Sequence, residues 1–213
     1  MRNTLLSLSV CVCSLAALNA ATLTNTLSFN TTDGNWNVAG NWNENSTTAS
    51  YIPGAEMAAI IGLNTSAVIN DGATYAAGNL WVRGGTLTVS SGTLAVNRAA
   101  DAFVQWGAGQ ANATSTLYIG SGGTVTNVGA NVVFGQGNNS TNSLVVDGGT
   151  FSMLANNMLM IGMGTGGEAL RNSTTMTVTN GGTFSSLGVV SVGRDAYSTG
   201  KIIVDNSYFK TTG

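Results

Sequence analysis

Carboxylates at a recurring position are the first residues that could do chemistry. Asp147 and Asp205 each end an apolar stretch just before a turn, and Asn180 holds the equivalent position between them. If these stretches are strands stacked about 4.8 Å apart, two layers separate the aspartates by about 9–10 Å. Retaining glycosidases hold their carboxyl groups about 5–5.5 Å apart and inverting ones about 6.5–9.5 Å apart. The pair is therefore marginal for inversion, and turn formation is the favoured explanation of both residues.

Other reactive groups are scarce. The sequence has no histidine, which excludes Ser-His-Asp and Cys-His systems and histidine-ligated zinc. The aspartates also lack the G-G-x-G-x-D spacing of calcium-loaded solenoids. We therefore predict no catalytic, cofactor-binding or metal site, no cofactor and no enzyme activity. The other charges considered are the single residues Asp101, Arg194 and Asp195, and a solvent-exposed pair, Glu168 and Arg171, in the longest expected loop, residues 163–175.

The elements that would position these residues form a repeat. Residues 143–152 read SLVVDGGTFS, and related stretches occur at 119–126, 178–185 and 203–210, with a fainter copy, WVRGGTLT, at 81–88. Between them lie short apolar strands that end at Gly107, Gly135, Gly162 and Gly193, which are 28, 27 and 31 residues apart. A period in the twenties with strand-like halves indicates a β-solenoid. We therefore predict an all-β fold, a right-handed parallel β-helix built as a single-stranded stack of coils.

Alternation along each strand predicts which residues face the core. Counting from the turns predicts three inward columns. They are Trp81, Ile119, Val145, Val178 and Ile203; Leu87, Val125, Phe151, Phe184 and Phe209; and Trp106, Phe134, Ile161 and Val192.

The turns themselves should be Asx-type corners. Their first position holds Asp71, Arg83, Ser121, Asp147, Asn180 and Asp205. Asp, Asn and Ser can hydrogen-bond their own backbone there, and the following glycines supply positive φ angles, which we expect at Gly149. Arg83 does not fit this pattern.

The N-terminus reads as a targeting segment. Residues 1–20 have a basic start at Arg2, an apolar stretch over 5–18, and a small residue, Ala20, at the expected cleavage point. The alternative is an uncleaved anchor, although the apolar stretch is short for a membrane span. Cleavage would remove Cys11 and Cys13, leaving no disulfide and no transmembrane segment.

Residues 21–57 are expected to form an irregular cap before the repeats of 58–213. Trp36 and Trp42 lie six residues apart among Asn and Gly. They could be exposed aromatic platforms that stack on sugars, but a solenoid needs its first layer covered, so capping is the preferred interpretation.

Composition agrees with an all-β exported chain. Charged residues make up 8% of the 213 residues, Gly numbers 29 and Pro one, and the net charge is −2. This balance gives no basic face for nucleic acid. A 43% hydrophobic content excludes a disordered chain. The sequons at Asn30, Asn45, Asn64, Asn112, Asn139 and Asn172 are expected by chance in so Asn- and Thr-rich a chain.

The pattern as a whole resembles exported bacterial surface proteins of the autotransporter-associated β-strand repeat and PEP-CTERM type. The features that carry the resemblance are Gly34-Asn35-Trp36, Gly40-Asn41-Trp42, Pro53 and the serial Leu-x-Val-x-x-Gly-Gly-Thr-Leu-x-Val units. The resemblance implies a right-handed β-helical surface or biofilm-matrix protein, generally without known activity. The sequence lacks the C-terminal barrel or Pro-Glu-Pro segment of such proteins and stops within a repeat, so we expect a fragment truncated at its C-terminus.

Two functions follow from these observations. The favoured one is a secreted, non-enzymatic, structural or adhesin-like solenoid of the bacterial surface or extracellular matrix. The alternative is a carbohydrate-active β-helix, either a glycan-binding module that uses Trp36, Trp42 or Tyr118 or, less favoured, a polysaccharide lyase or hydrolase. The expected partners are cell-surface or extracellular polysaccharide and, through open ends or edges, further copies of the chain.

Overall fold

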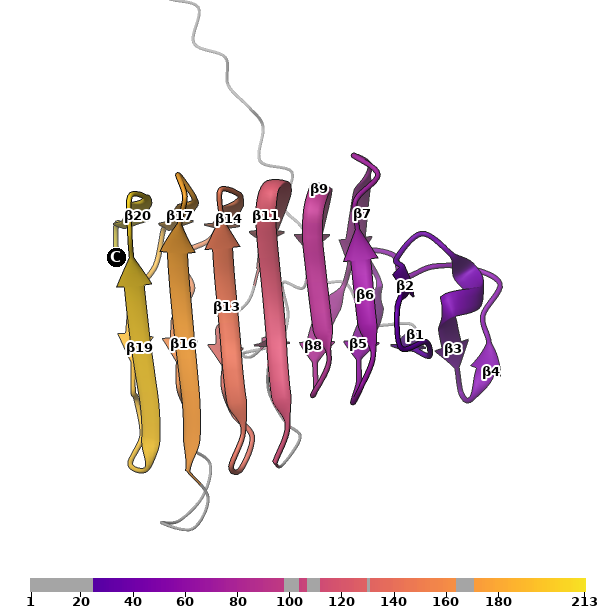
Figure 1. The fold of residues 1–213 in the computed structure, drawn as a ribbon, viewed down its shortest axis with the longest axis horizontal. Coiled ribbons are helices and arrows are strands. Elements are labelled where there is room, and N and C mark those ends of the chain that lie inside the picture. The colour runs from indigo at the N-terminus through magenta and orange to yellow at the C-terminus, as the bar shows by residue number, and fades with distance from the viewer. Residues whose placement is uncertain (1–24, 98–103, 107–111, 130, 164–170) are drawn as a thin grey trace, which may run out of the picture.

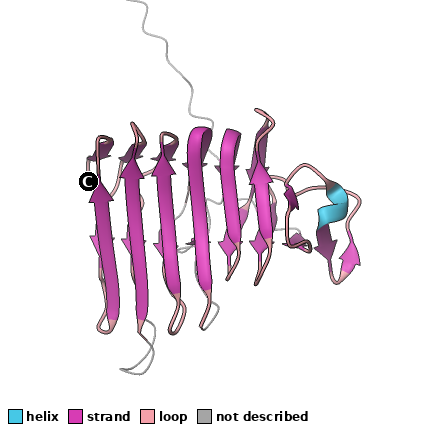
Figure 2. Cartoon of the chain, in the orientation of Figure 1, coloured by secondary structure: helices cyan, strands magenta, loops and turns pink. Residues whose placement is uncertain are grey.

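The computed structural model describes residues 25–97, 104–106, 112–129, 131–163 and 171–213, with the backbone alone for 104–106. The predicted signal peptide with Cys11 and Cys13, together with Asp101 and Glu168, lies outside the described residues. Within these ranges the chain is all-β, without an α-helix and with one short 3₁₀ turn, η1 (Ala39–Asn41). Figure 2 shows that turn at the N-terminal end of a stack of strands.

The strands are short, apart from two that run on through a corner. Their bounds are β1 (Asn25–Phe29), β2 (Gly34–Asn35), β3 (Trp42–Glu44), β4 (Thr47–Thr48), β5 (Met57–Ile61), β6 (Ser66–Ile69), β7 (Thr74–Ala77), β8 (Asn79–Val82), β9 (Thr86–Val96), β10 (Val104–Trp106), β11 (Thr114–Asn127), β12 (Val132–Phe134), β13 (Thr141–Asp147), β14 (Thr150–Met153), β15 (Leu159–Ile161), β16 (Asn172–Thr179), β17 (Thr183–Ser186), β18 (Val190–Val192), β19 (Ser198–Val204) and β20 (Tyr208–Thr211).

Most strands pair in parallel with the equivalent strand of the next repeat unit, as Figure 1 shows along the length of the molecule. Each unit has three strand positions. The first is occupied by β6, the start of β9 and of β11, then β13, β16 and β19. The second is occupied by β7, the ends of β9 and β11, then β14, β17 and β20. The third position holds β1, β5 and β8 in one sheet and β10, β12, β15 and β18 in another. The mostly parallel pairing is compatible with a β-helix.

Like residues stack on like along the interior. In the second position, Val125, Phe151, Phe184 and Phe209 are paired in register as predicted, and Phe184 packs between the rings of Phe151 and Phe209 at centroid distances of 5.5 and 4.7 Å. In the third position, the predicted register of Trp106, Phe134, Ile161 and Val192 is also confirmed. The side chains of Phe134, Phe151 and Phe184 are fully buried.

The column predicted by counting back from the turns needs correction at two positions. Val146 and Val204, not Val145 and Ile203, pair with Ile119 and Val178. Val146 is fully buried, whereas Val145 points outward and is partly exposed. A shift of one residue along a strand moves a side chain to the opposite face, so a single-residue error in counting exchanges an inward residue for an outward one.

The faint copy at 81–88 was also misassigned. Trp81 lies opposite Ile60 in the third position, and Leu87 pairs with Leu117 in the first. The second-position residue of that unit is Leu94, which pairs with Val125. The glycine pair at 84–85 therefore precedes a first strand and does not join the first strand to the second.

The source of the counting error is an alternation in turn length. We use "linking turn" for the residues between the first and second strand positions of one unit. Register places four residues in the linking turns 70–73, 120–123 and 179–182, and three in the intervening turns 90–92, 147–149 and 205–207. A register shift marks the extra residue between Ile119 and Gly122. Long and short turns thus alternate along the whole series.

The segment expected to be an irregular cap is more regular than predicted. It contains β1, which continues the third-position sheet in parallel with β5, and β2, which pairs with β6. Only β3 and β4 are antiparallel, folding back on β1.

Among the described residues, no helix is long and apolar enough to cross a lipid bilayer.

Candidate functional site

The predicted Asp147 carboxylate is a hydrogen-bond acceptor that joins three units. Its Oδ2 accepts the hydroxyl of Tyr118 at 2.5 Å, and its Oδ1 accepts the side-chain amide of Asn180 at 2.6 Å. Tyr118 belongs to β11, Asp147 ends β13, and Asn180 lies in the turn after β16. The carboxylate therefore connects neighbouring layers across the linking turns.

These hydrogen bonds shift the titration of both partners. The pKa of Asp147 lies below its ordinary value because the Tyr118 hydroxyl and then the Asn180 amide stabilise the ionised carboxylate. The pKa of Tyr118 is raised, mainly because its hydroxyl donates to that carboxylate. The arrangement keeps Asp147 ionised and Tyr118 protonated, which suits a structural hydrogen bond more than proton transfer.

Asp71 repeats this arrangement near the N-terminal end. Its carboxylate accepts the hydroxyl of Tyr75 at 2.5 Å and the amide of Asn37 at 2.8 Å. It also accepts its own unit's Ala73 N–H at 3.1 Å, which confirms the predicted Asx turn at this position. The pKa of Asp71 is lowered, first by Tyr75 and then by the Ala73 amide.

Asp147 and Asp205 hold equivalent register positions, each directly after the paired column of Val146, Val178 and Val204, but their surroundings differ. Thr179, rather than Asn180, lies opposite Asp147, and Asp205 follows Val204 one strand further on. Asn180 instead has a left-handed conformation, at φ 53°, as does Gly181 after it, at 79°. The Asp147 carboxylate accepts hydrogen bonds from two side chains. Asp205, directly after β19, has an exposed side chain. Among the described residues, the side chains bonded to the Asp147 carboxylate are a phenol and an amide, not a second carboxylate.

Trp36 and Trp42 are core residues, so the proposed role of these rings as sugar platforms is wrong. Both side chains are fully buried. Their rings meet edge-to-face at 4.7 Å, Trp42 meets Phe29 in the same way at 5.0 Å, and the indole N–H of Trp42 donates to the carbonyl of Trp36. The pair covers the first layer, which is the capping role that the sequence favoured.

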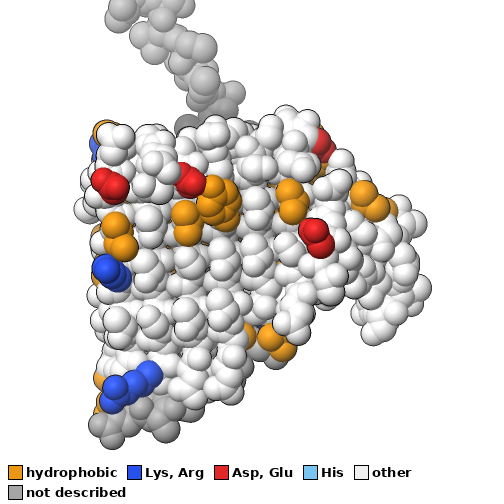
Figure 3. Space-filling model, in the orientation of Figure 1, with side chains coloured by type: hydrophobic (Ala, Val, Ile, Leu, Met, Phe, Trp, Pro, Cys, Tyr) orange, Lys and Arg blue, Asp and Glu red, His pale blue; other side chains and the backbone are white. Residues whose placement is uncertain are grey.

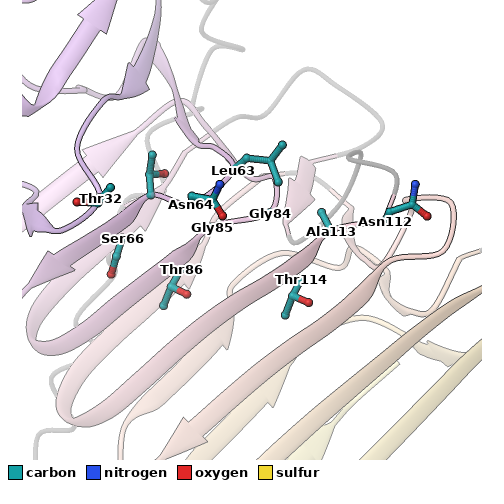
Figure 4. Close-up of a pocket in the computed structure, with 11 residues that line it drawn as sticks. Thr32, Leu63, Asn64, Ser66, Gly84, Gly85, Thr86, Asn112, Ala113 and Thr114 are labelled. Carbon is teal, nitrogen blue, oxygen red and sulfur yellow. The ribbon is translucent and has the colours of Figure 1, made fainter.

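A shallow hollow of about 480 Å³ opens where the first strands of three units begin. Figure 4 shows Ser66, Thr86 and Thr114 along these strand starts, with Leu63 and Asn112 on the loops that precede them. Leu63 is half-exposed. The lining is uncharged: Thr32, Leu63, Asn64, Thr65, Ser66, Gly84, Gly85, Thr86, Asn112, Ala113 and Thr114.

The hollow borders an outward face that sequence reasoning missed. On the first-position strands, one register row is Ser66, Thr86, Thr116, Ser143, Thr175 and Lys201. The row two residues earlier contains Thr114, Thr141, Ser173 and Thr199. We call these two rows the hydroxyl face. The alternating Thr-x-Thr, Thr-x-Ser and Ser-x-Thr patterns at 114–116, 141–143 and 173–175 were the available signal.

Three sequons have a common structural origin. Asn64, Asn112 and Asn139 are exposed, have φ values of 58°, 58° and 52°, and each lies two residues before a first-position strand. Asparagine tolerates this left-handed conformation, and threonine, which begins two of the three strands that follow, favours extended structure. The chance explanation is therefore incomplete, because the turn geometry itself selects the two residue types.

The remaining predicted charges are dispersed. Arg83 lies 4.5 Å from the centre of the Trp81 ring, and burial lowers the pKa of its guanidinium. Arg194 directs a guanidinium N–H at the sulfur of Met160, 3.0 Å away. Arg171 is exposed. The part of the chain that the structure describes contains no group of three or more His, Cys, Asp or Glu residues that could hold a metal ion.

Comparisons with protein-family models, characterised proteins and solved structures returned no match to this chain.

Proposed function

We propose that the chain is a right-handed parallel β-helix that serves as an exported, non-enzymatic scaffold of the bacterial surface or extracellular matrix. The observation that carries this proposal is the register of the interior columns. The same kinds of apolar side chain follow one another through successive units at all three strand positions. A chain built this way lengthens by adding layers, which suits a rod or spacer.

The use of the carboxylates supports a scaffold over a hydrolase. Asp71 and Asp147 each accept hydrogen bonds from a tyrosine and an asparagine, and those donors come largely from neighbouring units. A general acid needs a raised carboxyl pKa, whereas both carboxyl pKa values here are lowered. These side chains are committed to holding layers together.

Export rests on the signal-peptide pattern of residues 1–20 and on the resemblance to exported surface proteins. Both remain predictions. Expression in a bacterium and N-terminal sequencing of the released protein test the first: we expect a start at Ala21. A released form that begins at Met1 would overturn it.

The experiment that tests the non-enzymatic assignment is a degradation screen. The full chain is incubated with neutral and acidic polysaccharides, and new reducing ends and unsaturated sugar products are measured. We expect none above a heat-treated control. Degradation of any polymer that disappears in Asp147→Asn or Asp205→Asn would overturn the scaffold proposal and favour a hydrolase or lyase.

A further inference from the structure

The hydroxyl face has a regular geometry that the scaffold role does not require. Each row crosses neighbouring parallel strands, so successive members of a row are about 4.8 Å apart. The two rows are separated by about 6.6 Å along each strand. Thr114, Thr141, Ser173 and Thr199 are exposed. In the other row Lys201 is exposed, and the remaining members are partly exposed: Ser66, Thr86, Thr116, Ser143 and Thr175. Each hydroxyl both donates and accepts hydrogen bonds. The face therefore offers a two-dimensional array of groups that can pair with the hydroxyls of a partner.

The charge of this face selects the class of partner. Lys201, at the C-terminal end of its row, is the one charged member of the two rows. Figure 3 shows this side of the molecule, where the middle of the strands is largely free of Lys, Arg, Asp and Glu colours. The adjoining hollow is also lined without charge. A neutral, hydroxyl-rich ligand matches such a surface, whereas an acidic polymer would find no row of cations.

Tyr118 adds an aromatic group beside the array. It follows Thr116 by two residues on β11 and so points to the same side of the sheet. A Cβ built on Gly120 would lie 3.2 Å from Cε1 of Tyr118, so the ring occupies the space that a side chain at position 120 would need. The hydroxyl is fixed by Asp147, which Asn180 holds in turn. The ring therefore lies along the strand, and its orientation is fixed in advance of any ligand.

These observations extend over one continuous strip. The hollow begins at Thr114, and Tyr118 lies four residues further along the same strand, a distance of about 13 Å. Thr116 lies between them on that strand, next to Thr86 of the hollow. The strip thus presents an aromatic ring, then aligned hydroxyls, then an uncharged hollow. Such a surface can recognise a chain of sugar rings: the apolar face of a sugar packs on the tyrosine, and the sugar hydroxyls pair with the threonines.

We propose that the hydroxyl face, Tyr118 and the hollow together bind a neutral polysaccharide, with one sugar ring against Tyr118 and the chain extending toward the hollow. Binding involves no bond cleavage, so it is compatible with the scaffold function and goes beyond it. Because the partner and the face are uncharged, affinity should change little between low and high salt.

The test is co-sedimentation of the chain lacking residues 1–20 with four insoluble neutral polysaccharides: cellulose, chitin, β-1,3-glucan and starch granules. We expect binding to at least one of them. Tyr118→Ala should weaken that binding about tenfold, equivalent to about 1.4 kcal/mol, through loss of the ring. Tyr118→Phe should retain most of it, because the ring remains.

A second pair of variants separates ligand contact from folding. Thr116→Lys places a charge in the middle of the face, and we expect it to abolish binding. Thr124→Lys is the matched control, because it alters the same strand beyond the linking turn, at an outward position of the second sheet face. It should bind like the parent. Thermal unfolding of each variant confirms that the fold is intact.

Several results would overturn the proposal. They are no sedimentation with any of the four polymers, equal loss in Thr116→Lys and Thr124→Lys, or binding that high salt removes. A hydroxyl array could alternatively order water, so ice shaping and thermal hysteresis are measured in parallel. Ice activity that Thr116→Lys abolishes, without polysaccharide binding, would assign the face to ice and reject the polysaccharide.

Discussion

At the scale of single residues, close backbone packing explains the second glycine of each Gly-Gly turn. Gly149 does not have the positive φ angle that the sequence suggested; that conformation belongs to Gly148, at 70°. A Cβ at position 149 would instead lie 2.4 Å from the carbonyl oxygen of Gly120 in the preceding unit. The residue type was predictable, but its reason is a contact between units that no local pattern contains.

Gly149→Ala should therefore lower the free energy of unfolding by about 1–3 kcal/mol, as overpacking does. Urea unfolding followed by circular dichroism measures the change. Gly40→Ala is the control, because a Cβ there meets nothing within 4 Å and the φ angle is ordinary. If both variants unfold at the same urea concentration as the parent, the close approach at Gly149 is wrong.

Phe151 gives the corresponding test of the core. Its side chain is fully buried against Phe184. Phe151→Ala should cost about 3–5 kcal/mol of unfolding free energy, as large-to-small core substitutions do. Tyr208→Ala, at an exposed ring, should cost much less. Equal melting of the two variants would contradict the assigned column.

Asp147 predicts a dependence of stability on acid. Its folded pKa lies below the unfolded value of about 3.9, so its contribution is present above that pH and is lost as the pH falls through the folded pKa. We expect the difference in unfolding free energy between parent and Asp147→Asn to be constant near neutrality and to shrink below about pH 4. Unfolding in urea across this range measures it. A difference that stays constant as the pH falls below about 4 would contradict this contribution of the Asp147 carboxylate.

At the scale of strands, the cap depends on aromatic packing. Trp42 contacts Phe29 and Trp36 and donates to the Trp36 carbonyl, all in full burial. Trp42→Ala should destabilise the chain by about 3–5 kcal/mol. Trp81→Ala should have a smaller effect, because Trp81 is only partly buried beside Arg83. Differential scanning calorimetry compares the two, and a larger effect at Trp81 would contradict the cap assignment.

The strands show how far the sequence could be interpreted. Repeated motifs predicted parallel stacking and the phenylalanine column, because those residues keep a constant distance from the second strand. Counting back from the turns gave Ile119 and Val178 correctly but failed at Val146 and Val204. The two failures precede three-residue turns, and the two successes precede four-residue turns. The hydroxyl face was not predicted, because the repeat motifs were used to assign inward positions only.

At the scale of the molecule, the two ends of the stack differ. The N-terminal end is closed by β3, β4 and the buried tryptophans, whereas β18, β19 and β20 pair on one side only within the described residues. Val204 and Tyr208 are about half-exposed there. Unpaired strand edges favour association with another chain.

We therefore predict that this chain self-associates with increasing concentration, as measured by sedimentation velocity. Val204→Lys should weaken the association, because it places a charge at the open end. Val38→Lys, at an exposed position near the cap, should leave it unchanged. Equal association of both variants and the parent would show that the contact lies elsewhere.

The alternation of linking turns also limits how such a chain can grow. Long and short turns follow one another without exception from 70–73 to 205–207, so the backbone repeats every two units although the sequence motif repeats every one. Removing a single unit, such as the one that begins at β13, would bring the two four-residue turns 120–123 and 179–182 against each other. Removing two would restore the pattern. The smallest insertion or deletion that leaves every neighbour unchanged is therefore a pair of units.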